Sequence, residues 1–172
     1  MVTATLREML ISAEAIRFGD FTLASGRKSK VYIDIKKAIT DPAILKKIAS
    51  EVLSHCTDFD AVAGVAVGGV PLAVSVSLAS GKPYVIIRKE QKGHGLASLI
   101  IGDVDGKRIL LVEDVTTSGG SAVFGIEQLR SAGAIVEDVI TVVDRNEGAE
   151  KMLSELKITL TPLVRMQDLI NE

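Results

Sequence analysis

Short runs of Val, Ile and Leu alternate along most of the chain with segments of helical periodicity. The runs predict buried strands at residues 61–67, 84–87, 108–112, 135–143 and 158–160. The helices expected before and between them cover residues 42–55, 71–79, 121–131 and 147–156. Asp41 can cap the first of these helices, and Pro42 suits its first position. The alternation is typical of an α/β fold, with helices on both faces of a mostly parallel, twisted sheet.

The first forty residues follow a different pattern. Apolar positions near the helical period predict a helix over residues 6–18. Two β-prone runs, residues 21–23 and 31–35, flank a Ser-Gly turn and predict a hairpin. We therefore expect residues 1–40 to form a small helix–hairpin unit in front of an α/β core made by residues 41–172.

Composition excludes several classes of function. The 172 residues are 47% hydrophobic and 24% charged, which suits a single globular domain. A net charge of -2 argues against nucleic acid as the main partner. No apolar run approaches the ~20 residues that span a membrane, and charged residues near the start argue against a signal peptide. The single cysteine, Cys56, fits a reducing compartment, so we expect a cytoplasmic protein without a membrane partner.

One predicted strand leads into an unusual polar sequence. Residues 109–112 are followed by the acid pair Glu113-Asp114 and then by small residues that open a helix. These small residues are Val115, Thr116, Thr117, Ser118, Gly119, Gly120 and Ser121. Free backbone N–H groups at a helix N-terminus bind phosphate, while carboxylates accept hydrogen bonds from sugar hydroxyls or bind magnesium. The alternative is an ordinary strand–helix turn in which Thr117 or Ser118 caps the helix.

Residues 109–119 closely resemble the motif with which type I phosphoribosyltransferases bind phosphoribosyl pyrophosphate (PRPP). In that family the two acids hold the ribose 2′- and 3′-hydroxyls, and the loop after them holds the 5′-phosphate. The resemblance implies that Glu113 and Asp114 bind the ribose and that the segment from Val115 to Ser121 completes the PRPP site.

A second polar segment, residues 88–98, follows another predicted strand. A cationic loop there could close over a diphosphate, stabilise charge on the leaving group and exclude water. The alternative is a solvated hairpin with incidental charges. The order Arg-Lys-Glu-x-Lys-x-His-Gly resembles the catalytic loop of orotate phosphoribosyltransferases. The residues that would then bind the diphosphate are Arg88, Lys89, Lys92 and His94. The resemblance also implies that Lys92, His94 and Asp114 are catalytic and that the loop reaches a partner subunit in a homodimer.

Base selection is predicted at Asp144-Arg145, which ends another strand. A guanidinium fork matches the geometry of a carboxylate such as that of orotate, although an ordinary surface ion pair is the alternative. The segment resembles the Asp-Arg stretch of orotate phosphoribosyltransferases, so the resemblance implies that Arg145 binds orotate, together with Thr117. Residues 21–29 are similar to the hood that lies over the base in that family.

Two positions depart from the family pattern. Ala24 stands where the hood often has lysine, and Lys28 or Lys30 is a hypothetical replacement. Gly68 stands where many relatives have lysine in their pyrophosphate-binding loop. A glycine-rich loop can still bind oxygen atoms through its backbone N–H groups, or it can serve simply as a turn. Both departures bear on the affinity for PRPP.

Together the resemblances imply transfer of the phosphoribosyl group of PRPP to orotate. The products would be orotidine 5′-monophosphate and pyrophosphate, in pyrimidine (UMP) biosynthesis. Mg2+ would be bound through PRPP, without firm direct protein ligands. The alternatives are a phosphoribosyltransferase for a purine or uracil and a non-enzymatic PRPP-sensing regulator. Arg145 and the hood favour orotate, and an acidic chain of this length has no room for an added DNA-binding module.

Overall fold

A six-stranded sheet forms the centre of the molecule in a computed structural model, which describes residues 3–90 and 98–170. Its strands are β3 (Ala61–Val65), β4 (Tyr84–Ile87), β5 (Ile100–Ile101), β6 (Ile109–Thr116), β7 (Asp138–Asp144) and β8 (Thr159–Arg165). They lie in the order β5-β4-β3-β6-β7-β8, and all neighbours pair in parallel except β4 and β5. The predicted mostly parallel α/β sheet is confirmed.

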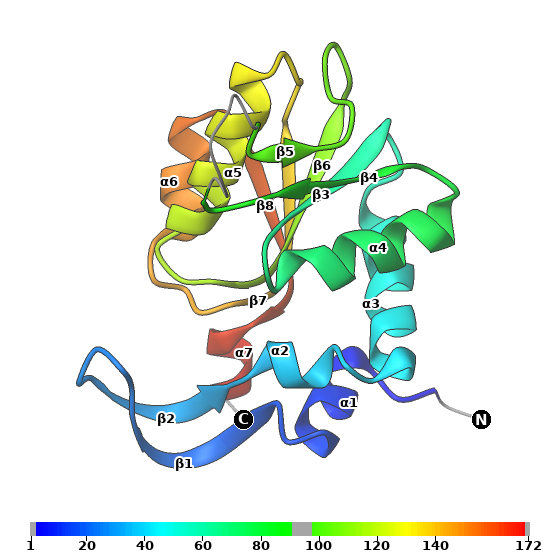
Figure 1. The fold of residues 1–172 in the computed structure, drawn as a ribbon. Coiled ribbons are helices and arrows are strands. Elements are labelled where there is room, and N and C mark those ends of the chain that lie inside the picture. Colours follow the sequence, from blue (N-terminus) through cyan, green and yellow to red (C-terminus); the bar gives the residue numbers. More distant parts are fainter. Residues whose placement is uncertain (1–2, 91–97, 171–172) are drawn as a thin grey trace.

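Helices cover both faces of this sheet (Figure 1). One face carries α3 (Pro42–His55) and α4 (Gly69–Ser80), and the other carries α5 (Gly120–Ser131) and α6 (Ala149–Glu155). On β6, Leu110 and Val112 pack toward α3 and α4, whereas Leu111 packs toward α5 and α6. Burial on both faces explains why these strands are continuously apolar. Within the described residues, no helix is long and apolar enough to cross a membrane.

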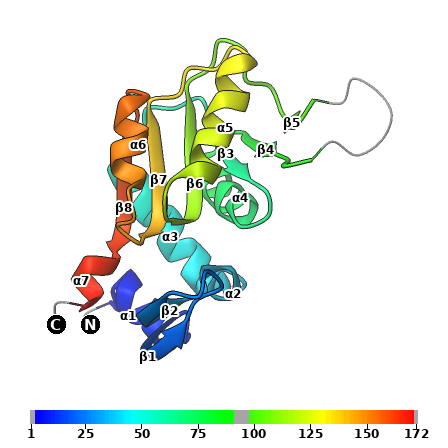
Figure 2. The ribbon, with the colours of Figure 1, turned by 90° about the vertical axis from the view of Figure 1, so that its left-hand side faces the viewer.

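A smaller layer lies across the end of the sheet where the parallel strands finish (Figures 1 and 2). It consists of α1 (Leu6–Ser12), β1 (Ile16–Thr22), β2 (Lys28–Ile33), α2 (Ile35–Ala38) and the C-terminal α7 (Met166–Ile170). We call the antiparallel hairpin β1–β2, residues 16–33, the hood. Leu10, Ile16 and Val31 belong to the same hydrophobic cluster as Ile48 and Leu110. The division at residue 40 stays a prediction, because one hydrophobic cluster extends across it.

The predicted helix over residues 6–18 is wrong beyond Ser12. The backbone of Glu14 has a φ of 57°, which ends helical geometry, and Ile16 begins β1 opposite Ile33. The pattern misled because a buried Ile16 fits either a helix face or a strand. The hairpin is confirmed, but Asp34 caps α2 where the second strand was expected to continue.

A strand runs further than predicted where its last residues pair with a neighbouring strand. The start of α3 is confirmed, and the Asp41 carboxylate accepts a hydrogen bond from the Ala43 N–H at 2.7 Å. By contrast, β6 runs past Val112 to Thr116, because the residues beyond Val112 pair with β7. The acid pair therefore lies within the last part of a strand, and the loop begins after Thr116.

Candidate active site

Glu113 and Asp114 are consecutive buried residues near the end of β6, with exposed fractions of 3% and 7%. The Ser121 hydroxyl donates to Glu113 Oε1 at 3.3 Å, and Lys36 Nζ donates to Asp114 Oδ2 at 2.8 Å. Burial, followed by the charge of Asp114, raises the pKa of Glu113 to about 7. Two adjacent buried carboxylates suit a ligand that donates hydrogen bonds or brings positive charge.

The loop after β6 leaves the start of α5 open to a ligand. Gly119 occupies the cap position with a φ of 92°, and no side chain caps the helix. The alternative in which Thr117 or Ser118 caps α5 is therefore wrong. A Cβ atom at Gly119 would lie 3.3 Å from Ala149 Cα, and the Thr117 carbonyl accepts from the Ala149 N–H at 3.2 Å. The loop is thus held against α6 by its backbone, and the first N–H groups of α5 have no side-chain partner.

Thr116 and Asp144 connect this loop to the end of β7. The Thr116 hydroxyl donates to Asp144 Oδ1 at 2.8 Å, and both residues are buried. Asn146 Nδ2 donates to the other Asp144 oxygen at 3.3 Å, and the Arg145 N–H donates to the Thr116 carbonyl at 2.9 Å. The Thr116 hydroxyl therefore points to Asp144. The predicted contribution of Thr116 to phosphate binding would then come from its backbone and from the way it positions the loop.

Arg145 is held by a carboxylate that also contacts the hood. Its side chain is 10% exposed, and Nε donates to Glu147 Oε1 at 3.2 Å. Arg27, at the tip of the hood, donates to Glu147 Oε2 at 2.7 Å. Burial alone would raise the pKa of Glu147, but the hydrogen bonds from Arg27 and Arg145 outweigh it and lower that pKa. Using Nε for Glu147 leaves the two terminal nitrogens of Arg145 for a ligand.

A cavity of about 280 Å³ opens beside Arg145. Its walls are the tip of the hood, the segment that follows β7 and helix α7. Lys28 lines this cavity and donates to the Thr22 hydroxyl at 2.8 Å, whereas Lys30 lies outside its walls and pairs with Asp20. Of the two lysines considered as replacements at Ala24, Lys28 is therefore the one beside Arg145.

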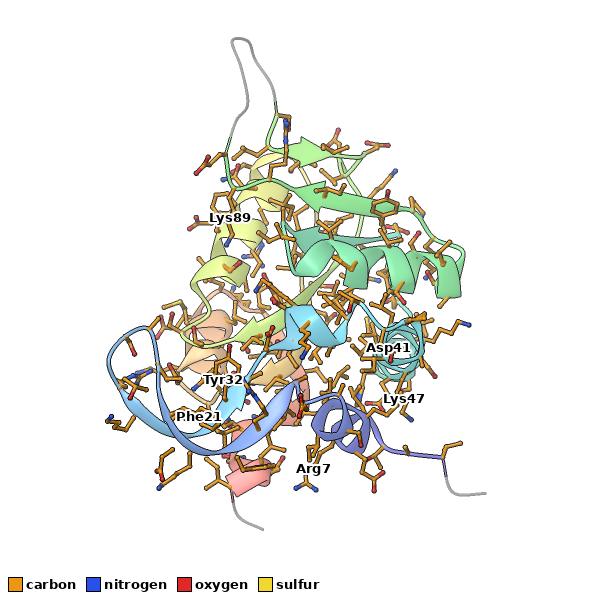
Figure 3. The ribbon with its side chains drawn as sticks, turned by 60° about the horizontal axis from the view of Figure 1, so that its bottom comes forward. Arg7, Phe21, Tyr32, Asp41, Lys47 and Lys89 are labelled. Carbon is orange, nitrogen blue, oxygen red and sulfur yellow. The ribbon has the colours of Figure 1, made fainter. Side chains whose placement is uncertain are left out.

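Aromatic contacts hold the two strands of the hood together (Figure 3). The ring centroids of Phe21 and Tyr32 lie 5.6 Å apart, and the Arg17 guanidinium lies 4.6 Å from the centroid of Tyr32. These contacts join β1 to β2 and leave the polar tip of the hairpin free to face the cavity.

Arg88 and Lys89 begin the predicted catalytic loop beyond β4. Arg88 Nη2 donates to the Ser98 carbonyl at 2.7 Å, while its buried Nε has no hydrogen-bond partner among the described residues. The positive charge of Lys89 reaches Glu113 and counteracts the rise in its pKa. Lys89 thus lies at the edge of the acid-pair site. Lys92 and His94 lie outside the described residues.

Lys36 and Glu147 are two site residues that no pattern in the sequence predicts. Lys36 is the first of two adjacent lysines in the short helix α2, and Glu147 precedes α6. Neither position belongs to a recognisable motif. Their contacts with Asp114 and Arg145 depend on packing between segments far apart in the chain.

Comparison with known proteins first defines the class. Residues 36–164 match the family model of the phosphoribosyl transferase domain. The chain is 91% identical over 171 residues to the orotate phosphoribosyltransferase of Methanospirillum hungatei, with 99% of each chain covered.

Solved structures agree with this class. The crystal structure of orotate phosphoribosyltransferase from Aeropyrum pernix matches with a TM-score of 0.86 and 35% identity, over 97% of both chains. That of the Mycobacterium tuberculosis enzyme in complex with PRPP matches with a TM-score of 0.71 and 29% identity, over 80% of this chain and 82% of that one. This chain belongs to the orotate phosphoribosyltransferase family, within the type I phosphoribosyltransferase fold.

Proposed function

We propose that this protein transfers the phosphoribosyl group of PRPP to orotate, forming orotidine 5′-monophosphate and pyrophosphate for UMP synthesis. The observation that carries the proposal is the buried acid pair of β6, which leads into an uncapped helix start, with Arg145 at the end of the adjacent strand. The M. tuberculosis relative whose structure contains PRPP supports the assignment of the donor. The 91% identity to an orotate phosphoribosyltransferase supports the assignment of the base.

The acid pair is proposed to bind the ribose of PRPP. Glu113 and Asp114 can accept hydrogen bonds from the two ribose hydroxyls. The segment from Val115 to Ser121 would hold the 5′-phosphate, because backbone N–H groups at the start of α5 attract an anion. This arrangement fixes both sides of the sugar and so positions its anomeric carbon.

Arg145 is proposed to select the base. Its two terminal nitrogens can donate parallel hydrogen bonds to the carboxylate of orotate, which purines and uracil lack. Lys28 lines the adjoining cavity and adds positive charge on the hood side. Thr117 lies on the loop that joins β6 to α5, and we propose that it also contacts orotate.

The reaction is proposed to be a direct substitution at the anomeric carbon. The bond from that carbon to the diphosphate oxygen breaks, its electron pair leaves with pyrophosphate, and a bond forms to N1 of orotate, which loses its proton. Positive charge develops on the sugar, as in glycoside chemistry. Arg88 and Lys89 can stabilise negative charge on the leaving group, and we propose the same for Lys92 and His94. Changing Lys92 to Ala should then lower turnover without altering folding, and unchanged turnover would exclude this role.

Mg2+ is proposed as the cofactor, bound mainly through PRPP. The described residues contain no group of three or more His, Cys, Asp or Glu side chains that could hold a metal ion. The pair Glu113 and Asp114 fits an ion that takes most of its oxygen ligands from the substrate and water. Such an ion would neutralise charge on the diphosphate.

A cytoplasmic homodimer is the form we propose for the working enzyme. Leu78 at the end of α4 is 82% exposed, and Ile101 on the edge strand β5 is 50% exposed. The main support for the dimer is the resemblance of residues 88–98 to a catalytic loop that reaches the neighbouring subunit. The single cysteine suits a reducing compartment. Burial raises the pKa of its thiol, which makes Cys56 less reactive. Sedimentation at micromolar concentration would test the dimer.

The proposed reaction is tested by mixing the purified protein with PRPP, Mg2+ and orotate and following the loss of orotate absorbance. Hypoxanthine, adenine and uracil serve as parallel substrates. We expect rapid loss that depends on magnesium and occurs with orotate alone. Product from a purine or uracil instead would overturn the role of Arg145. PRPP binding without turnover on any base would favour a sensor.

A further inference from the structure

The Gly68-Gly69 turn at the start of α4 packs against the acid pair of β6. A Cβ atom at Gly68 would lie 2.3 Å from Asp114 Oδ2, and one at Gly69 would lie 3.0 Å from the Val112 carbonyl oxygen. A side chain at Gly68 therefore has no room unless the Asp114 carboxylate moves. The turn can offer its backbone to an anion, but it carries no cation of its own.

Lys36 brings a cation to this place from another part of the chain. Its Nζ contacts the same Asp114 oxygen that blocks a side chain at Gly68. The hydrogen bond to Asp114, with the charges of Asp114, Asp34 and Glu113, raises the pKa of Lys36 and keeps it protonated. Its side chain is 65% exposed, whereas that of Asp114 is 10% exposed. An ammonium group has three donors, so those not used for Asp114 remain accessible to a ligand.

We propose that Lys36 binds the diphosphate of PRPP, and the pyrophosphate product, beside the Gly68-Gly69 turn. This inference rests on the proposed function and names a binding residue for it. Asp114 holds the ammonium in place before the substrate arrives, which lowers the entropy lost on binding. Helix α2 follows the hood directly in the chain. Lys36, which would bind the leaving group, is therefore attached to the hairpin that would cover the base.

Binding measurements on the full chain separate this role from a structural one. The probes are pyrophosphate and ribose 5-phosphate, each titrated with Mg2+ by calorimetry. We expect Lys36→Met to weaken pyrophosphate and PRPP binding about 10- to 100-fold, because a charge-assisted hydrogen bond to phosphate is lost. Ribose 5-phosphate should bind nearly as before. Lys36→Arg should recover most of the affinity, since it restores the charge.

Lys37→Met is the matched control, because it removes the same charge from the same helix and Lys37 is exposed. Unchanged pyrophosphate affinity in Lys36→Met would overturn the proposal and leave Lys36 as a brace between hood and core. An equal loss of affinity for ribose 5-phosphate would also overturn the proposal, because Lys36 would then act through Asp114. If Lys36→Met does not fold, Lys36→Gln gives the same comparison. Absence of orotate turnover in the unchanged chain would overturn the proposed function, while the pyrophosphate titration alone decides the role of Lys36.

Discussion

Glu147 accepts hydrogen bonds from Arg27 at 2.7 Å and from Arg145 at 3.2 Å, and so joins the hood to the end of β7. Arg27 and Glu147 are 120 positions apart in the chain. The side chain of Arg27 is 62% exposed, so its ion pair adds little to stability. Arg145 is far more buried, and its orientation depends on the carboxylate that holds Nε. We infer that Glu147 positions the guanidinium group for the base.

Replacing Glu147 with Ala should raise the KM for orotate about tenfold, the value of one well-placed hydrogen bond to a charged group. The KM for PRPP should change little, because Glu147 contacts Arg145, the residue proposed to bind the base. Initial rates with each substrate varied in turn measure both constants. Glu150→Ala is the control, since Glu150 lies in α6, three positions after Glu147, and pairs with Arg165 of β8 at 3.2 Å. Equal values of the orotate KM in the two variants would contradict the role of Glu147.

Arg145→Lys should lower kcat/KM for orotate about 100-fold, because a point charge cannot reproduce two parallel hydrogen bonds. PRPP affinity, measured by calorimetry, should stay close to that of the unchanged chain. Arg165→Lys provides a matched change, since Arg165 lies opposite Asp144 on β8. A similar small decrease of kcat/KM for orotate in both variants would show that Arg145 is not the residue that recognises the carboxylate.

Glu113 should make stability depend on pH. Its folded pKa of about 7 lies above the ordinary value of 4.5, so its neutral form stabilises the fold at low pH. This stabilisation is complete below pH 4.5 and is lost as the pH rises through 7. Between pH 5 and pH 8 the free energy of unfolding of the ligand-free chain should therefore fall by on the order of 2 kcal/mol. The Glu113→Gln variant should not show this decrease.

Urea denaturation at a series of pH values measures this difference. Glu150→Gln is the control, because Glu150 is exposed and pairs with Arg165. Parallel curves for the unchanged chain and Glu113→Gln would show that the carboxyl group titrates normally. The affinity for PRPP should also increase as the pH rises through 7. The Glu113→Gln variant should lack this pH dependence.

Gly119→Ala should lower the free energy of unfolding by about 1–2 kcal/mol, because the residue has a φ of 92° and its Cβ would press on Ala149. Gly120→Ala is the comparison. Apart from its chain neighbours and the backbone of its own helix, no described atom lies within 4 Å of its Cβ position, and alanine favours a helix. Denaturation curves should therefore separate the two variants, with Gly120→Ala at least as stable as the unchanged chain. Equal stability would contradict the strain assigned to Gly119.

Local chemistry explains what the sequence could predict. Asp41 and Pro42 cap and begin α3 through contacts within one turn, so the start of that helix is readable. The acid pair and the loop after it stand together in the chain, and a continuous strand carries them to the carboxyl end of the sheet. The α/β class follows from strands that are apolar on both faces.

Tertiary contacts account for the rest. Strand β6 extends to Thr116 because β7 lies beside it, and no local pattern records that pairing. The ion pair of Lys36 with Asp114 joins positions 78 apart. An exposed lysine in a short helix carries no signal of such a partner. Ile16 fits two kinds of secondary structure, and the β1–β2 pairing decides between them.

The hydrophobic cluster that Leu10, Ile16 and Val31 share with Ile48 and Leu110 limits how the enzyme can be redesigned. A hood from another enzyme cannot be grafted as an independent module, because its apolar side would have to match the interior of this core. The tip from Arg27 to Ser29 emerges from that cluster and faces the cavity beside Arg145. Selection for a new base is therefore free to act on the tip, while the requirement to fold conserves the root of the hairpin.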